Sequence, residues 1–164
     1  VIDDNPRFTC RIPGLKKRSP ARIILDSGLN IPINYNIIQL AKKYRTIIFY
    51  NKIKKKKIKI LKKMNIKLLR EPLCSDENFD LKKILFKVKR LGFSRILLES
   101  GLKLSSNFFK YKLVDDFYLF ISNKNVNRHG KNNIKKLLKS YVKNKKHVDI
   151  KVNLFGDKLI RYKI

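Results

Sequence analysis

The feature that most constrains the fold of this chain is an alternation of short β-branched runs with longer amphipathic stretches. Strands are predicted, in chain order, over residues 21–27, 45–51, 66–69, 94–99 and 114–122. Residues 52–67 and 79–93 place isoleucines and leucines at the spacing of one helix face, and Gly92 is positioned to end the second of these helices. Another helix is expected from Gly101 to Tyr111. This alternation favours an α/β fold in which helices flank a mostly parallel sheet.

The carboxyl-terminal part of the sequence changes this pattern. Residues 147–164 are predicted to form two strands joined at Gly156-Asp157, which is typical of an antiparallel hairpin. The hairpin would add an antiparallel edge and make the sheet mixed. The 164 residues contain no internal repeat and no linker, so we expect a single domain over residues 1–164.

The charge of the chain raises the possibility of a polyanionic partner. The formal net charge is +29, from 41 Lys and Arg against 12 Asp and Glu, and phosphate neutralisation by such residues dominates nucleic-acid binding. The lysines are spread from Lys16 to Lys163, and the densest run, residues 52–67, lacks interleaved aromatic residues. We therefore interpret the charge as a solvated, lysine-coated surface and the run as an amphipathic surface helix. A basic nucleic-acid-binding protein is the alternative, although no RRM, KH or helix-turn-helix pattern is present.

Other classes of protein are disfavoured by the composition. Cys10 and Cys74 form no CxxC pair, so neither a metal site nor a disulfide framework is predicted. No apolar run approaches the roughly 18 residues that a membrane span needs, and no signal peptide is visible. We expect a protein of the reducing cytoplasm that makes no membrane contact.

Polar and small residues follow three of the predicted strands, where ligands bind in open α/β sheets. These strand ends are Asp26-Ser27-Gly28, Tyr50-Asn51-Lys52 and Glu99-Ser100-Gly101. A helix that begins at Gly101 would direct free N–H groups and a positive dipole end toward a phosphate group. Glu99 could accept hydrogen bonds from a substrate in the same crevice. It could equally cap the helix or lie in a turn without a ligand.

The amino-terminal motif narrows these alternatives. A first motif comprises Val1, Asp4, Asn5, Pro6, Phe8, Thr9 and Arg11, followed by Pro20, Arg22, Asp26 and Ser27. A glutamate-glycine block follows from Leu98 to Phe108, and after it comes the LVDDFYLFIS run from Leu113. In these three motifs the sequence resembles the riboflavin-biosynthesis reductase family, the reductase half of a bifunctional deaminase/reductase. Residues 122–133 depart from the family pattern, which leaves the role of that loop open.

The resemblance implies a fold and an activity. It implies a dihydrofolate-reductase-like fold and NADPH-dependent reduction of 5-amino-6-(5-phosphoribosylamino)uracil to its ribitylamino product. The family's N-terminal strand and helix precede Val1, so we expect this chain to lack them, and a fragment without activity of its own is a further alternative. The zinc deaminase domain, if present, would lie upstream, because no H-x-E or P-C-x-x-C motif occurs here. A homo-oligomer, a dimer or larger, is also expected.

The resemblance also implies site residues. The cofactor-binding positions are Asp4, Ser27, Gly101, Leu102, Lys103, Leu104, Ser105, Ser106 and Asn107. The substrate-binding positions are Phe8, Arg11 and Glu99, of which Glu99 is the catalytic candidate. Asn51 and Lys52, at the strand end next to Ser27, are structural candidates for the 2′-phosphate of NADPH.

Each of these residues has another possible role. The planar fork of Arg11 suits a substrate phosphate, although a surface arginine on a loop would look the same. Phe8 could pack on the substrate or in the core, and Asp4 could merely cap the turn before Pro6. A pterin or folate reductase of the same fold is a further alternative, which the D-N-P-x-F-T-x-R block disfavours.

Overall fold

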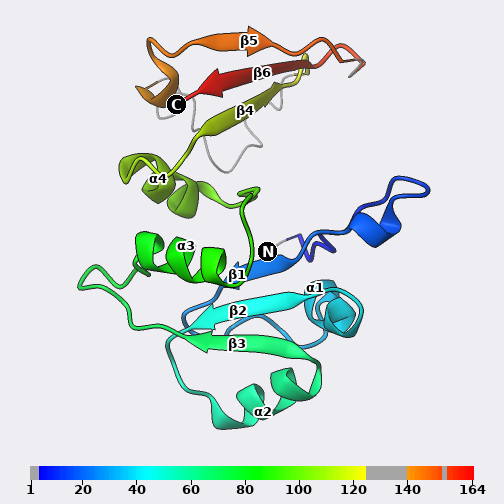
Figure 1. Ribbon diagram of the computed structural model, residues 1–164, viewed down its shortest axis with the longest axis vertical. Helices are drawn as coiled ribbons and strands as arrows, with labels where there is room; N and C mark the ends of the chain where they lie inside the picture. Colours follow the sequence, from blue (N-terminus) through cyan, green and yellow to red (C-terminus); the bar gives the residue numbers. More distant parts are fainter. Residues whose placement is uncertain (1–3, 125–139, 153–154) are drawn as a thin grey trace. The chain divides into compact units, whose positions relative to one another are not determined.

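The structure is a computed structural model, and it describes residues 4–124, 140–152 and 155–164 (Figure 1). The chain divides into two compact units, Val1–Phe93 and Ser94–Ile164. The expectation of a single reductase domain over residues 1–164 stays a prediction.

The elements of the first unit largely follow the sequence prediction. In chain order they are η1 (Lys16–Arg18), β1 (Arg22–Leu25), α1 (Asn36–Gln39), η2 (Leu40–Lys42), β2 (Thr46–Tyr50), α2 (Lys55–Lys63), β3 (Ile66–Arg70) and α3 (Leu81–Arg90). The three strands form a parallel sheet in the order β1-β2-β3. The middle strand supplies Ile47, Ile48 and Phe49, none of which is accessible to solvent. The predicted strands of this unit are therefore confirmed.

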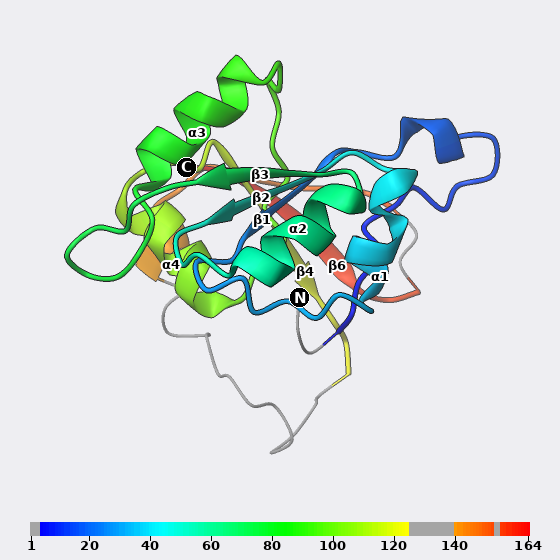
Figure 2. The ribbon, with the colours of Figure 1, turned by 90° about the horizontal axis from the view of Figure 1, so that it is seen from below.

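Helices cover both faces of this parallel sheet. Successive residues of a strand point to opposite faces, so Ile48 packs toward α1 and α2, and Phe49 packs on Ile84 and Val88 of α3. Figures 1 and 2 show α2 and α3 on opposite sides of β1, β2 and β3. The predicted stop of α3 is confirmed, because Gly92 has a φ of 92° and donates its N–H to the carbonyl of Lys89 at 2.9 Å. This half of the fold is a three-layer α/β arrangement.

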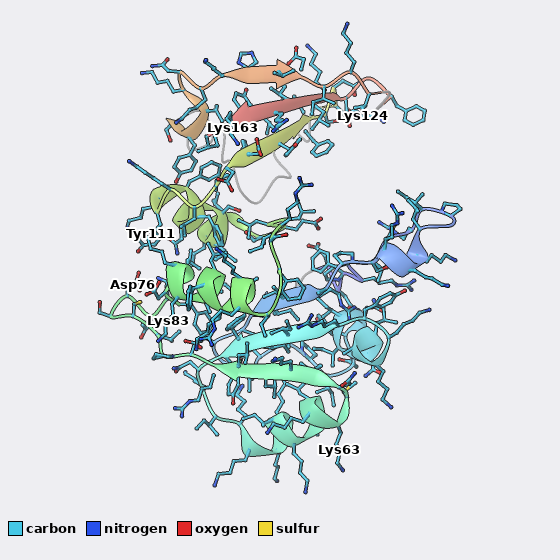
Figure 3. All side chains as sticks on the ribbon, in the orientation of Figure 1. Lys63, Asp76, Lys83, Tyr111, Lys124 and Lys163 are labelled. Atoms are coloured by element: carbon cyan, nitrogen blue, oxygen red, sulfur yellow. The ribbon has the colours of Figure 1, made fainter. Side chains whose placement is uncertain are left out.

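The lysine-rich run forms the amphipathic helix that its spacing predicts. In α2, Leu61 is fully buried, and Ile58 packs against the same core cluster. Lysines cover the outer side of the helix, and Lys63 projects away from the sheet (Figure 3). The run is therefore a structural element of the unit and contributes an apolar stripe to its core.

Among its described residues, the second unit contains a helix packed on an antiparallel sheet. Its elements are α4 (Leu102–Lys110), β4 (Asp116–Ile121), β5 (His147–Asp149) and β6 (Lys158–Lys163). The strand order is β4-β6-β5, so both neighbours of β6 are antiparallel to it. The predicted C-terminal hairpin is confirmed, with β5 at the edge and β6 in the middle. Phe109 of α4 packs on Phe117 of β4 with ring centroids 5.3 Å apart, which joins helix and sheet.

One predicted strand is wrong. Residues 94–99 carry no strand, and no backbone hydrogen bond joins them to a neighbour within the described part of the chain. Ile96 is the single β-branched residue of this segment, and Leu97 is 80% exposed. A strand is stable only where an adjacent strand accepts its hydrogen bonds and its side chains are covered. The described strands consequently divide evenly between parallel and antiparallel pairings, where a mostly parallel sheet was expected.

Candidate functional site

The amino-terminal motif forms an irregular segment beside the parallel sheet. Over residues 4–11, Asp4 and Arg11 are exposed, and Phe8 is half-buried against the core cluster that contains Ile48. Phe8 also has a φ of 46°, a left-handed conformation that is uncommon for a bulky residue. Packing in the core and packing on a substrate are thus compatible roles for Phe8, since its side chain contacts the core and is only half-buried.

The turn after β1 is closed by a carboxylate. Asp26 accepts hydrogen bonds from the backbone N–H groups of Asn30 and Ile31, both at 2.8 Å. These bonds bring the chain sharply away from the strand and leave Ser27 at its carboxyl end. Asp26, which belongs to the first family motif, therefore has a structural role that explains its position beside a predicted ligand residue.

The carboxyl ends of β1 and β2 meet as the sequence predicts. The carbonyl of Ser27 accepts hydrogen bonds from the N–H groups of Asn51 at 2.9 Å and Lys52 at 2.8 Å. The side-chain amide of Asn51 in turn donates to the carbonyl of Glu71, just beyond β3, at 3.0 Å. These contacts join the three strand ends into one continuous edge. Among the described residues, the Ser27 hydroxyl and the Lys52 ammonium make no hydrogen bond or ion pair, so both are available to a ligand.

Three further cations surround this edge. Lys54 donates to the side-chain oxygen of Asn30 at 2.9 Å, Lys57 donates to the carbonyl of Ile31, and Arg70 donates to the carbonyl of Asn51 at 3.3 Å. Burial lowers the pKa of Lys57, which Asp26 opposes and Lys54 reinforces. Sequence reasoning missed these residues, because Lys54 and Lys57 belong to a run interpreted as a solvated surface. Lys54 follows soon after β2 and Arg70 is the last residue of β3, so for these two the closeness to a strand end was the signal that could have found them.

Asp26→Ala is expected to lower the free energy of unfolding by about 1–3 kcal/mol, because two backbone N–H groups lose their acceptor. Asp26→Asn keeps an amide oxygen that can accept one of the two bonds, so its loss should be smaller. Urea denaturation of both variants measures the difference. Parent-like stability of Asp26→Ala would contradict the structural role of this carboxylate.

The second set of predicted residues surrounds the start of α4. Gly101 precedes the helix with a φ of −68° and provides no side-chain cap for the first-turn N–H groups. A Cβ added at Gly101 would meet no atom within 4 Å, so the backbone here is open to a ligand. The hydroxyl groups of Ser100 and Ser105 lie 3.0 Å apart across the first turn. The start of α4 has the features of an anion-binding site, because its first backbone N–H groups have no side-chain cap and the helix dipole is positive at this end.

The remaining predicted residues lie on or beside this helix. Glu99 and Lys103 are exposed, and Leu104 to Asn107 are half-buried along α4. A helix places successive residues about 100° apart, so Leu102 to Asn107 cannot all face one ligand through their side chains. The backbone of Leu102 to Leu104 is the part that can donate to a phosphate. The structure therefore groups the predicted residues into two sets, one in each unit.

A cavity of about 410 Å³ opens elsewhere in the first unit. It lies around the amino-terminal ends of β2 and β3, at the edge of the sheet opposite Ser27, and none of the predicted site residues lines it. Its wall residues are Ala41, Lys42, Lys43, Arg45, Thr46, Lys62, Asn65, Ile66 and Lys67. Because ligands of α/β sheets bind at the carboxyl ends of strands, we assign the candidate site to the Ser27 edge.

Residues 4–124, 140–152 and 155–164 contain no group of three or more His, Cys, Asp or Glu side chains able to hold a metal ion. Cys10 and Cys74 are free thiols. None of the helices in the same portion combines the length and hydrophobicity required to cross a bilayer.

The amino-acid sequence of the chain is similar to those of proteins with known names. A 30% identity over 128 residues relates the chain to the riboflavin biosynthesis protein RibD of Actinobacillus pleuropneumoniae, covering 77% of this chain and 33% of that protein. A 26% identity over 119 residues relates it to the 2,5-diamino-6-ribosylamino-4(3H)-pyrimidinone 5′-phosphate reductase of Aquifex aeolicus, covering 73% and 51%. The chain thus spans about a third to a half of the length of these relatives.

The fold and the family follow from two further comparisons. The structure of Acinetobacter baumannii RibD superimposes with a TM-score of 0.71 at 16% identity, over 99% of this chain and 44% of that one, so the two share a fold. The family description "RibD C-terminal domain" matches residues 1–150, which include every predicted site residue. Both the expected family and its reductase fold are confirmed, and the chain belongs to the RibD C-terminal domain family.

Proposed function

We propose that this chain reduces the ribosyl group of 5-amino-6-(5-phosphoribosylamino)uracil to a ribityl chain, as a step of riboflavin biosynthesis. The observation that carries the proposal is the family match over residues 1–150. Relatives named as riboflavin biosynthesis proteins and as a pyrimidinone phosphate reductase support it. Within this chain, the polar edge at Ser27 and the open helix start at Gly101 supply the polar contacts that such ligands require.

The names of the relatives are consistent with two different substrates. The reductases of Aquifex aeolicus and Archaeoglobus fulgidus are named for a 2,5-diamino pyrimidinone, which retains an amino group where the uracil substrate has an oxygen. We propose the uracil substrate because the RibD relatives include a 30% identical match. Supplying each compound in turn and measuring its kcat/KM distinguishes them. A higher kcat/KM for the diamino compound would replace the proposed substrate.

The proposed cofactor is NADPH, which supplies the hydride when bound. Asp4, Ser27 and the residues from Gly101 to Asn107 would hold it, and Phe8, Arg11 and Glu99 would hold the substrate. The residues fit such a cofactor in two respects. The backbone at Gly101 is open and uncapped, which suits a pyrophosphate. The cationic edge around Ser27, Asn51 and Lys52 suits the extra phosphate that distinguishes NADPH from NADH.

NADPH is expected to bind at least about tenfold more tightly than NADH, because a charge-assisted hydrogen bond to the 2′-phosphate contributes about 1.5–3 kcal/mol. Fluorescence titration of the full chain with both nucleotides measures this preference. Lys52→Gln should reduce it by removing an exposed cation at the Ser27 edge. Lys63→Gln is the matched control, since Lys63 is an exposed lysine at the far end of α2. Equal affinities of the parent for the two nucleotides would contradict the cofactor assignment.

Several broader expectations also stay proposals. These are the single reductase domain, a homo-oligomeric assembly, a cytoplasmic location and a surface that does not bind nucleic acid. The oxidoreductase class itself is supported by the relatives that are named as reductases.

A further inference from the structure

Arg22 is a buried charge to which the proposed function gives no task. It is the first residue of β1, belongs to the Pro-x-Arg part of the family motif, and is 3% exposed. Burial lowers its pKa, an effect that Tyr44 opposes. Its Nε atom has no hydrogen-bond partner among the described residues. An apolar side chain would fill this position at a lower desolvation cost, so stability alone does not explain an arginine here.

The contacts of Arg22 show what the guanidinium achieves. One terminal nitrogen donates to the carbonyl of Arg7 at 3.1 Å. The other donates to the carbonyl of Tyr44 at 3.1 Å and to the hydroxyl of Thr46 at 2.6 Å. The planar fork therefore bridges the motif segment, residues 4–11, to the start of β2. A lysine ammonium is a point donor and cannot span both sides of this bridge.

Asn5 anchors the same segment at a second point. Its side-chain oxygen accepts the backbone N–H of Asn36 at 2.8 Å, and its carbonyl accepts the side-chain amide of Asn36 at 3.1 Å. Asn5 has a φ of 42°, a conformation that asparagine tolerates better than most residues. The segment is thus fastened to the first residue of α1 as well as to the sheet.

Each proposed ligand residue of the segment is the direct neighbour of an anchored residue. Asn5 follows Asp4, and Arg7 precedes Phe8. A third point of attachment lies next to Arg11, because the N–H of Cys10 donates to the hydroxyl of Ser19 at 3.1 Å. Each proposed ligand residue consequently has a neighbour whose backbone or side chain is held by the rest of the unit.

We propose that Arg22 and Asn5 are positioning residues that hold residues 4–11 in the conformation that presents Asp4 to the cofactor and Phe8 and Arg11 to the substrate. This inference rests on the proposed function for the identity of the two ligands. The anchoring itself does not depend on that identity. Since one segment carries contacts to both ligands, releasing it weakens both together, whereas loss of a single contact residue weakens one.

The test compares Arg22→Lys and Asn5→Ala with two matched variants in the full chain. Arg45→Lys changes another arginine at a strand start that donates to a carbonyl, that of Leu91, and lies outside the motif segment. Asn5→Asp keeps the oxygen that accepts the N–H of Asn36. Amide hydrogen exchange monitors residues 4–11 against β2, and titration and steady-state kinetics give the NADPH Kd and the KM for 5-amino-6-(5-phosphoribosylamino)uracil.

Arg22→Lys and Asn5→Ala should speed exchange over residues 4–11 while β2 stays as protected as in the parent. Each should raise both the NADPH Kd and the substrate KM about tenfold, with a smaller change in kcat. Arg45→Lys and Asn5→Asp should resemble the parent. Asn5 lies outside the sheet, so its variants still test whether anchoring residues 4–11 affects ligand binding if Arg22→Lys fails to fold.

Two results would overturn the proposal. Unchanged exchange over residues 4–11 in both variants would show that the side chains do not anchor the segment. Faster exchange with unchanged binding of both ligands would show that the segment does not position them. A parent protein that bound neither ligand would instead contradict the proposed function, and the exchange data would still decide whether the anchors exist.

Discussion

Glu99→Gln is expected to lower kcat for the ribosylaminouracil about 100-fold and to leave the NADPH Kd almost unchanged. Glutamine keeps the shape of the side chain but removes the negative charge that strengthens a hydrogen bond to a polar group of the substrate. A substrate held slightly out of the reactive geometry loses about two orders of magnitude in rate. Steady-state kinetics and nucleotide titration on the same preparation separate the two effects.

Glu77→Gln is the matched control for this substitution. Glu77 is an exposed glutamate between β3 and α3, outside both sets of site residues, so the same chemical change there should alter neither constant. Parent-like turnover in Glu99→Gln would show that the site is misplaced. A collapse of NADPH binding in a folded Glu99→Gln protein would assign this carboxylate to the cofactor and reverse the proposed division of roles.

The parts of the fold that could be predicted are those with local causes. The run before Asp26 and the run around Ile48 are rich in β-branched residues, and burial keeps Ile23 to Leu25 and Ile47 to Phe49 apolar. Gly92 ends α3 because glycine adopts positive φ readily. The amphipathic spacing around Leu61 identified α2 within a run that composition alone would call a basic tail.

The wrong prediction has a non-local cause. Residues 94–99 are apolar enough to form a strand, but strand formation depends on a hydrogen-bonding neighbour that no short window of sequence contains. The central position of β6 has the same origin, because a hairpin signal identifies one partner of a strand and not the second.

The candidate site could be predicted in part. The rule that ligands gather at strand ends correctly brought Ser27 next to Asn51 and Lys52, since parallel strands end at a common edge. The roles of Arg22 and Asn5 could not be predicted. Both depend on hydrogen bonds to residues 15 and 31 positions away in sequence, and such contacts are defined only once the chain is folded.

Arg11→Lys is expected to weaken substrate binding by roughly 1–3 kcal/mol, which corresponds to about a 5- to 150-fold rise in KM. The substitution keeps the charge but removes the planar fork that can bind a phosphate through two parallel hydrogen bonds. The NADPH Kd should not change, because Arg11 is proposed to contact only the substrate. Arg18→Lys is the matched control, since Arg18 is an exposed arginine in η1 of the same unit.

Combining Arg11→Lys with Arg22→Lys tests whether Arg22 affects substrate binding by positioning Arg11. If Arg22 holds the segment that presents Arg11, a released segment has already lost most of the contact with the substrate phosphate. The double variant should then raise KM by less than the product of the two single effects, because the two changes remove the same interaction. Its NADPH Kd should match that of Arg22→Lys alone. Multiplicative effects on KM would show that Arg22 does not act through Arg11, and a parent-like KM in Arg11→Lys would place the substrate phosphate elsewhere.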